Sequence, residues 1–221
     1  MTSRAPPTVL FDLDGTLIDS VHDLAWTANE LRRHRGLPPL PTAAIREVVT
    51  LGTHAMLEQA LGAEAADDEP TRDEFLDTYQ LGCTRTSSLF PGMHAVLSSF
   101  ERAGIPWGVV TNKRERFTRP LLEHLGLAER TRCIVCGDST PRPKPDPAPL
   151  HLAAALCNTT PESCLYVGDA HSDVQAARAA GMVSVIALFG YIPRDENPTH
   201  WGADHAVAAP EELVALLGIE T

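Results

Sequence analysis

The stretch VLFDLDGTLIDS, residues 9–20, places three acids directly after a short run of strand-forming apolar residues. Asp12 and Asp14 are two positions apart, and residues i and i+2 of an extended chain face the same side. Their like charges would therefore lie close together unless a cation or a shared proton neutralises them. A simple turn also uses Asp, Gly and Thr, but it does not need two acids. The stretch predicts a buried strand that ends in a site with paired carboxylates.

From about residue 90 onward, short apolar runs alternate with helix-like segments, which is typical of a parallel sheet with crossover helices. We predict strands over 8–11, 107–111, 132–136, 164–168 and 183–188. We predict helices over 93–103, 117–125, 147–157, 172–180 and 210–217. The expected fold class is therefore α/β, with a Rossmann-like parallel-sheet core.

Residues 18–88 interrupt this alternation, because they contain helical patterns in succession and no convincing strand. The acid-rich stretch GAEAADDEP, residues 62–70, is predicted to be a solvated surface loop among these helices. We therefore expect a core domain over 1–17 and 89–221, and an inserted α-helical cap domain over 18–88. The connections near 16–20 and 84–91 would act as a paired hinge.

Composition limits the classes of partner. Lys and Arg total 18 and Asp and Glu total 29, so the net charge of −11 argues against nucleic acid and against an anionic membrane surface. The longest apolar-rich run, residues 183–192, is about half of the roughly 20 residues that a membrane span needs. The five cysteines are scattered and odd in number, which indicates reduced thiols. We expect a soluble cytoplasmic protein, as a monomer or a homodimer, that acts on a small molecule.

Ligands of open parallel sheets bind beyond the carboxyl ends of the strands, and polar residues of complementary kinds follow the predicted strands here. Thr111 and Asn112 follow the strand at 107–111, Asp169 and Asp173 follow the strand at 164–168, and Lys144 lies between two prolines. Each has a simpler interpretation, as a helix cap, a first-turn acid or a surface lysine. Together, however, acids on two strand ends suit Mg²⁺, and a lysine with a hydroxyl suits phosphate oxygens.

The set Asp12-x-Asp14-Gly15-Thr16, Thr111-Asn112, Lys144-Pro145 and Gly168-Asp169-x-x-x-Asp173, in this order, resembles the haloacid dehalogenase superfamily of phosphatases. The resemblance covers the whole chain, and the helical insertion resembles the first cap type of that superfamily. It implies that Asp12 attacks phosphorus and forms an aspartyl phosphate, while Asp14 protonates the leaving alkoxide and later deprotonates a water.

The resemblance also implies the binding residues. Asp12, Asp169 and the main-chain carbonyl of Asp14 would hold Mg²⁺, with Asp173 in a supporting role. The phosphoryl group would be bound by Gly15, Thr111, Asn112 and Lys144. His22, Arg46, His54 and His171 are further polar residues that we expect near the cleft, without a catalytic role.

The substrate is narrowed by further stretches of the sequence. The chain is most similar to the phosphoglycolate phosphatase branch, and RRHRGLPPL at 32–40, EFLDTYQLGC at 74–83 and GYIPRDENPTHWGAD at 190–204 look similar to the N-acetylmuramic acid 6-phosphate phosphatases of cell-wall recycling. This resemblance ranks N-acetylmuramic acid 6-phosphate slightly above 2-phosphoglycolate. A sugar phosphomutase of the β-phosphoglucomutase kind shares the same motifs and stays an alternative. A non-catalytic binding protein on this fold is a weaker alternative.

Overall fold

The computed structural model describes residues 7–219, so residues 1–6 and 220–221 of the predicted core domain lie outside the described part. Its main sheet has six strands in the order β5-β4-β1-β6-β7-β8, and every neighbouring pair is parallel. The strands are β1 Thr8–Phe11, β4 Trp107–Val110, β5 Ile134–Val135, β6 Cys164–Gly168, β7 Val183–Ala187 and β8 His205–Val207. The predicted α/β class with a Rossmann-like parallel core is confirmed.

Two details of the sheet differ from the prediction. The strand β5 is shorter than the predicted 132–136, and β8 was not predicted. Only the last of the three β8 residues is buried, so the segment lacks the apolar run that marks an interior strand. Pairing with β7, from Val185↔His205 to Ala187↔Val207, is what makes it a strand.

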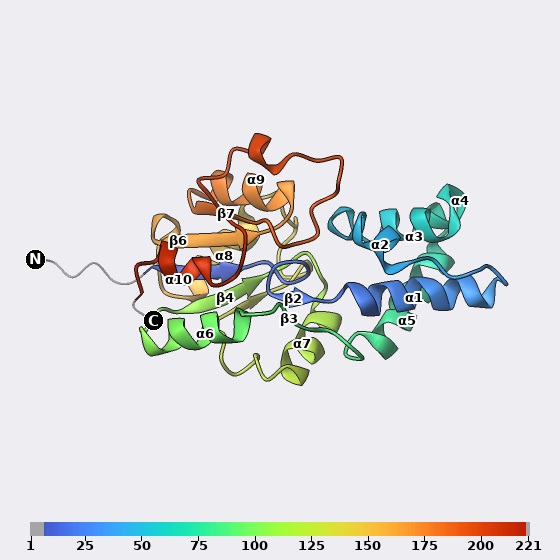
Figure 1. Cartoon of the computed structure of the whole chain (residues 1–221), viewed down its shortest axis with the longest axis horizontal. Coiled ribbons are helices and arrows are strands. Elements are labelled where there is room, and N and C mark those ends of the chain that lie inside the picture. The colour runs from blue at the N-terminus through green and yellow to red at the C-terminus, as the bar shows by residue number, and fades with distance from the viewer. Residues whose placement is uncertain (1–6, 220–221) are drawn as a thin grey trace, which may run out of the picture.

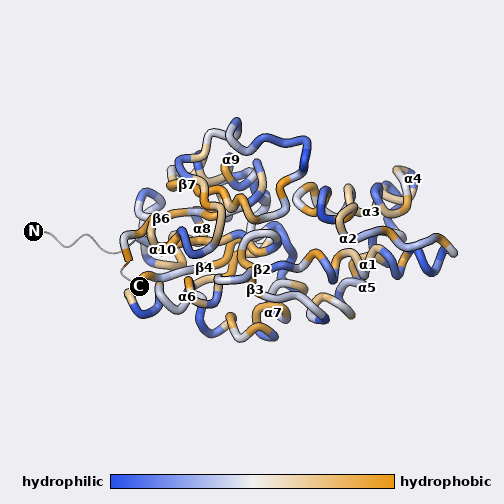
Figure 2. Tube along the Cα trace, in the orientation of Figure 1, coloured by the Kyte–Doolittle hydropathy of each residue, from blue (hydrophilic) through white to orange (hydrophobic). Residues whose placement is uncertain are grey.

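Helices cover both faces of the sheet (Figure 1), and the alternation of side chains along β1 shows why. Val9 and Phe11 pack into one apolar cluster with residues of α6 Met93–Arg102, α7 Glu115–His124 and α10 Glu212–Leu216. Leu10 packs into a second cluster on the other face, with residues of α8 Ala148–Leu156 and α9 His171–Ala180. The hydropathy colouring shows the strands of this layer as mostly apolar (Figure 2).

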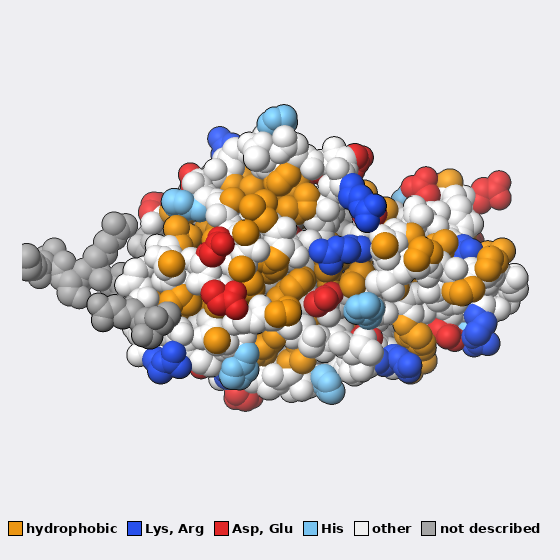
Figure 3. Space-filling model, viewed as in Figure 1, with side chains coloured by type: hydrophobic (Ala, Val, Ile, Leu, Met, Phe, Trp, Pro, Cys, Tyr) orange, Lys and Arg blue, Asp and Glu red, His pale blue; other side chains and the backbone are white. Residues whose placement is uncertain are grey.

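The chain between β2 Ile18–Asp19 and β3 Ser88–Leu89 is helical. Its helices lie together at one end of the molecule, next to the core (Figure 1). Its helices are α1 Val21–His34, α2 Thr42–Arg46, α3 Thr53–Leu61, α4 Ala63–Asp67 and α5 Glu69–Gly82. We propose that this arrangement is the cap domain of residues 18–88. Lys and Arg side chains are visible on the face drawn in Figure 3 near the junction of the two parts.

The predicted surface loop at 62–70 is wrong in part. Residues 63–67 form α4, and Glu69 begins α5, whose N-cap Asp68 accepts a hydrogen bond from the Thr71 N–H. Alanine and glutamate favour helix, and Ala66 is the buried residue of this short helix. The charge of the stretch was therefore a poorer guide than its helix propensity.

The two connections to the helical part are bonded to each other. β2 and β3 pair as antiparallel strands, with Ile18 opposite Leu89 and Asp19 opposite Ser88. Beside them, the buried Asp23 of α1 accepts hydrogen bonds from the N–H and hydroxyl groups of both Thr86 and Ser87, at 2.6–3.1 Å.

Among residues 7–219, no helix combines the length and apolarity that crossing a bilayer requires.

Candidate active site

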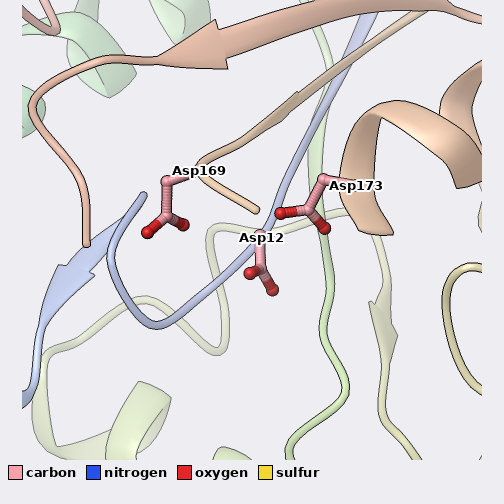
Figure 4. Close-up of side chains that lie close together, drawn as sticks. All are labelled: Asp12, Asp169 and Asp173. Carbon is pink, nitrogen blue, oxygen red and sulfur yellow. The ribbon is translucent and has the colours of Figure 1, made fainter. Parts of the chain in front are cut away.

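Three carboxylates converge at the carboxyl edge of the sheet. Asp12 follows β1, Asp169 follows β6, and Asp173 lies in the first turn of α9, so three separate segments supply them (Figure 4). One oxygen of each lies within 4.8 Å of the others. Asp169 and Asp173 are buried, and Asp12 is largely so. This concentration of negative charge has to be balanced by cations.

Lys144 is one of those cations. Its Nζ lies 2.9 Å from Asp12 Oδ1 and 2.7 Å from Asp173 Oδ1, and it also donates to the Tyr166 hydroxyl at 2.6 Å. Burial lowers the pKa of Lys144, but the charges of Asp12 and Asp173 outweigh it and raise that pKa to about 12. Lys144 therefore stays charged, although its side chain is almost fully buried.

Asn112 fixes the backbone that carries Lys144. Its side-chain amide donates to the Lys144 carbonyl at 3.0 Å, and its side-chain oxygen accepts from the Lys144 N–H at 2.9 Å. The side chain of Asn112, predicted to bind the phosphoryl group, is thus paired with the main chain of Lys144. Thr111, also predicted to bind it, is buried, and its Oγ1 accepts from the Lys113 N–H at 3.1 Å, so its hydroxyl proton stays available.

Asp169 is held by two donors. Its Oδ1 accepts from the Thr16 hydroxyl at 2.8 Å and its Oδ2 from the Tyr191 N–H at 2.7 Å. Gly15 lies against the same carboxylate, since a Cβ on Gly15, which has a φ of +84°, would lie 2.1 Å from Asp169 Oδ2. In this structure Gly15 therefore permits close approach to Asp169, which any larger residue would prevent.

Asp14 is bonded separately from the other three acids. Both of its oxygens accept from Lys113 Nζ, at 2.9 and 2.7 Å, and the Ser20 hydroxyl donates to its Oδ1. The positive charge of Lys113 is maintained although burial opposes it, because the carboxylate of Asp14 raises the pKa of Lys113.

Lys113 is the main residue that the sequence prediction missed. It directly follows Thr111 and Asn112 in the sequence, and it was given no role. A signal was present, because the chain has only two lysines, Lys113 and Lys144, and both follow predicted strands. The structure brings each of them to one of the two acids of the first motif.

The acidic cluster fits a divalent metal ion. Asp12 Oδ1 is buried and, within the described residues, accepts no hydrogen bond of good geometry, although it lies beside Lys144. Burial raises the pKa of Asp169 well above its usual value, and the charges of Asp12 and Asp173 raise it further. Burial likewise raises the pKa of Asp12 to about 6 in spite of Lys144. Oxygen donors with this surplus of negative charge are what hard cations bind.

A cavity of about 380 Å³ lies between this sheet edge and the helical part. Asp12, Asp14, Thr111, Lys113 and Lys144 line its polar end. The wall opposite is mostly apolar and comes from the helical part; it includes Leu24, Val49, Met56, Phe75, Leu76 and Tyr79, together with the turn at 50–53. This volume lies in the range of small-molecule sites.

The polar residues expected near the cleft do not line the cavity. His171 stacks on Trp201 with ring centroids 5.7 Å apart, and His54 pairs with Asp67 at 2.9 Å on the surface. Arg46 contacts the core instead, donating to the carbonyls of Phe189 and Gly190, with its guanidinium 4.7 Å from the Tyr191 ring centroid. None of these three residues lines the cavity, and neither does His22.

Comparison with known proteins agrees with this geometry. A family model described as haloacid dehalogenase-like hydrolase matches residues 9–187. The N-acetylmuramic acid 6-phosphate phosphatase of Pseudomonas aeruginosa is 43% identical over 211 residues, 95% of this chain and 93% of that protein. A phosphoglycolate phosphatase of Xanthomonas campestris is also 43% identical over 211 residues, 95% of this chain and 96% of that protein. The crystal structure of a predicted phosphoglycolate phosphatase from Haemophilus somnus has a TM-score of 0.84 at 24% identity, covers 97% of this chain and 99% of its own, and shares the fold.

Proposed function

The chain belongs to the haloacid dehalogenase-like hydrolase family, and on that premise we propose that it is a Mg²⁺-dependent phosphomonoesterase that works through an aspartyl phosphate on Asp12. The named relatives are phosphatases, which makes this chain a phosphoric monoester hydrolase of the same family. One observation carries the proposal: Asp12 and Asp14 have separate lysine partners, Lys144 and Lys113, and so separate environments.

The first half-reaction needs a nucleophile and a proton donor. An oxygen of Asp12 forms a bond to phosphorus while the bond from phosphorus to the ester oxygen breaks, and Asp14 gives its proton to the departing alkoxide. Asp14 is suited to this because it lies outside the cluster of Asp12, Asp169 and Asp173 and is oriented by Lys113 and Ser20. The second acid thus moves protons, and the first forms the covalent bond.

The second half-reaction restores Asp12. Asp14 takes a proton from a water whose oxygen attacks phosphorus, and the bond between Asp12 and phosphorus breaks to release phosphate. Lys144 and the Thr111 hydroxyl would hold the phosphoryl oxygens through both steps, since both line the polar end of the cavity. Asn112 would contribute by fixing the main chain of Lys144.

The metal would be held by Asp12, Asp169 and the main-chain carbonyl of Asp14, with Asp173 supporting it through its bond to Lys144. When bound, Mg²⁺ would neutralise charge that builds up on the phosphoryl oxygens. The surplus of carboxylates over lysines in the cluster supports a divalent ion.

We propose N-acetylmuramic acid 6-phosphate as the substrate, ahead of 2-phosphoglycolate. The two phosphatases named above are equally identical to this chain and carry different substrate names, so they do not separate the two esters. The cavity of about 380 Å³, with a broad apolar wall, favours the ester with the larger organic part.

The test is phosphate release by the purified chain, measured as kcat/KM for the two esters side by side. We expect turnover that stops with EDTA and with Asp12→Asn, and that persists in the control Asp195→Asn, which removes an exposed acid. Full turnover by Asp12→Asn would show that the nucleophile is wrongly assigned. Conversion of β-glucose 1-phosphate to glucose 6-phosphate would favour a phosphomutase instead. Mg²⁺ binding without turnover of any phosphate ester would favour a non-catalytic binding protein.

A further inference from the structure

Within residues 7–219, the hydroxyl of Tyr79 is a buried polar group that makes no hydrogen bond of good geometry, although Lys113 lies close to it. Tyr79 lies in α5 of the helical part and is 2% exposed. Within residues 7–219, only two buried side-chain nitrogen or oxygen atoms lack a hydrogen-bond partner, and these are Tyr79 Oη and Asp12 Oδ1. Both residues line the same cavity, Asp12 from the core and Tyr79 from the helical part. Buried polar groups are normally paired, so each of these atoms indicates a ligand.

The aromatic ring of Tyr79, in contrast, contacts two side chains of the core. It packs edge-on against Phe117 with ring centroids 5.3 Å apart and planes at 62°. Lys113 Nζ lies 4.7 Å from the centroid of the Tyr79 ring and is also bonded to Asp14. A phenylalanine would make both contacts equally well. The packing therefore accounts for an aromatic ring at position 79 but not for its hydroxyl.

The hydroxyl is a hydrogen-bond donor under ordinary conditions. Burial raises the pKa of Tyr79 further above its usual value, and the nearby positive charge of Lys113 does not reverse this. A protonated phenol can donate to an ether, hydroxyl or carbonyl oxygen of a ligand. Because Lys113 is bonded to Asp14, the ring lies beside the acid that we assign to the leaving alcohol rather than beside Lys144.

The surroundings of Tyr79 suit an organic group and not a second phosphate. Met56 of α3 and Phe75 and Leu76 of α5 line the same wall and are buried. Arg72 of α5 also lines the cavity, but its guanidinium is paired with Glu69 at 3.1 Å and about half exposed. The wall thus combines apolar side chains, one oriented hydroxyl and a cation at its margin.

We propose that Tyr79 and the apolar side chains of Met56, Phe75 and Leu76 form a subsite for the organic part of the ester, in which the Tyr79 hydroxyl donates a hydrogen bond to an oxygen of the sugar. This inference rests on the proposed function and adds a specificity-determining residue to it. A site that provides a hydrogen bond to a substrate oxygen discriminates strongly against esters that lack that oxygen. The core residues, which act on the phosphoryl group and on the ester oxygen bonded to it, cannot make this distinction.

Tyr79→Phe isolates the hydroxyl, because the ring contacts with Phe117 and Lys113 are kept. We expect kcat/KM for N-acetylmuramic acid 6-phosphate to fall by about 5- to 100-fold. We expect kcat/KM for methyl phosphate, a phosphate ester that has no sugar, to change less than about twofold, together with the inhibition constant of inorganic phosphate. The melting temperature is expected to stay the same or to rise, since a buried unpaired hydroxyl is removed.

Tyr79→Leu is the matched comparison, because it also removes the ring beside Lys113 and Asp14. It is expected to lower kcat for both esters. If Tyr79→Phe instead lowers turnover of both esters equally, the hydroxyl acts on the proton-transfer acid and the subsite assignment is wrong. A lower melting temperature for Tyr79→Phe would mean that the hydroxyl is already bonded in the free protein, which also overturns the proposal.

Binding separates this inference from the proposed function. Calorimetry on the Asp12→Asn protein, with and without Tyr79→Phe, measures affinity for N-acetylmuramic acid 6-phosphate and for inorganic phosphate without turnover. The subsite predicts weaker binding of the sugar phosphate alone, and equal affinities in the two proteins would overturn it. Failure of the wild-type chain to hydrolyse either ester, with this binding difference intact, would contradict only the phosphatase assignment.

Discussion

The two sides of the cavity are built differently. On the core side, each carboxylate is held by short polar contacts, as Asp169 is by Thr16 and Tyr191 and Asp14 is by Lys113 and Ser20. On the helical side, the wall is mostly apolar, and its one buried hydroxyl, that of Tyr79, has no partner among the described residues. Fixed charges suit a reaction that is the same for every phosphate ester, whereas an apolar wall can be changed to suit another alcohol.

Lys113→Met gives the largest effect that we expect among these variants, because it removes the cation paired with Asp14 and keeps most of the side-chain volume. Asp14 then loses both of its contacts to Lys113 Nζ. We expect kcat to fall by roughly 10²-fold or more, with a much smaller change in KM, since a positioned acid and base contributes about 10² to 10⁴. Steady-state kinetics on a phosphate ester measures this, with Arg119→Met, an exposed residue paired to Glu115, as the control. A change in KM alone would contradict the role given to Asp14.

Asp23→Asn tests the connection between the two sides. The carboxylate accepts bonds from Thr86 and Ser87, and an amide cannot accept all of them. We expect the free energy of unfolding to fall by about 2–3 kcal/mol, because hydrogen bonds to a buried charged group are among the stronger ones. Denaturant unfolding at neutral pH measures the difference. A loss below about 0.5 kcal/mol would show that these bonds contribute little.

The same group predicts a pH dependence. Burial tends to raise the pKa of Asp23, but the hydrogen bonds from Thr86 and Ser87 outweigh it and lower that pKa below its usual value. Its contribution to stability is therefore complete above the unfolded-state pKa of about 4 and is lost as the pH falls through the folded-state value. The stability gap between wild type and Asp23→Asn should narrow when unfolding is measured at successively lower pH from 6 to 3. A gap that widens on acidification would contradict the lowered pKa.

Arg46→Met is expected to give a smaller effect than Asp23→Asn. Arg46 joins α2 to the core through the carbonyls of Phe189 and Gly190 and the ring of Tyr191. We expect a loss of about 1–2 kcal/mol in the free energy of unfolding. Arg194→Met, which breaks the pair of the exposed Arg194 with Glu47 at 3.0 Å, should cost less than about 1 kcal/mol. Equal losses for the two variants would show that burial of Arg46 adds nothing to the contact between the two sides.

Much of the fold was predictable because its signals are local. The five strands expected from apolar runs are all present, and the helices between them start and end close to the predicted residues. β8 could not be predicted in this way, since its three residues are mostly exposed and become a strand only by pairing with β7. α4 was missed because its acidic residues were taken as a sign of solvation, although its alanines favour helix.

The sequence by itself determined which residues meet at the site, because each follows a strand, and parallel strands bring their carboxyl ends to one edge of the sheet. Asp12, Asp169 and Asp173 meet there as expected. Only the tertiary structure decided the pairing of acids with cations, since Lys113 and Asp14 are 99 positions apart and nothing local relates them. The unpartnered hydroxyl of Tyr79 was likewise decided by tertiary structure, because whether a buried group lacks a partner depends on everything packed around it.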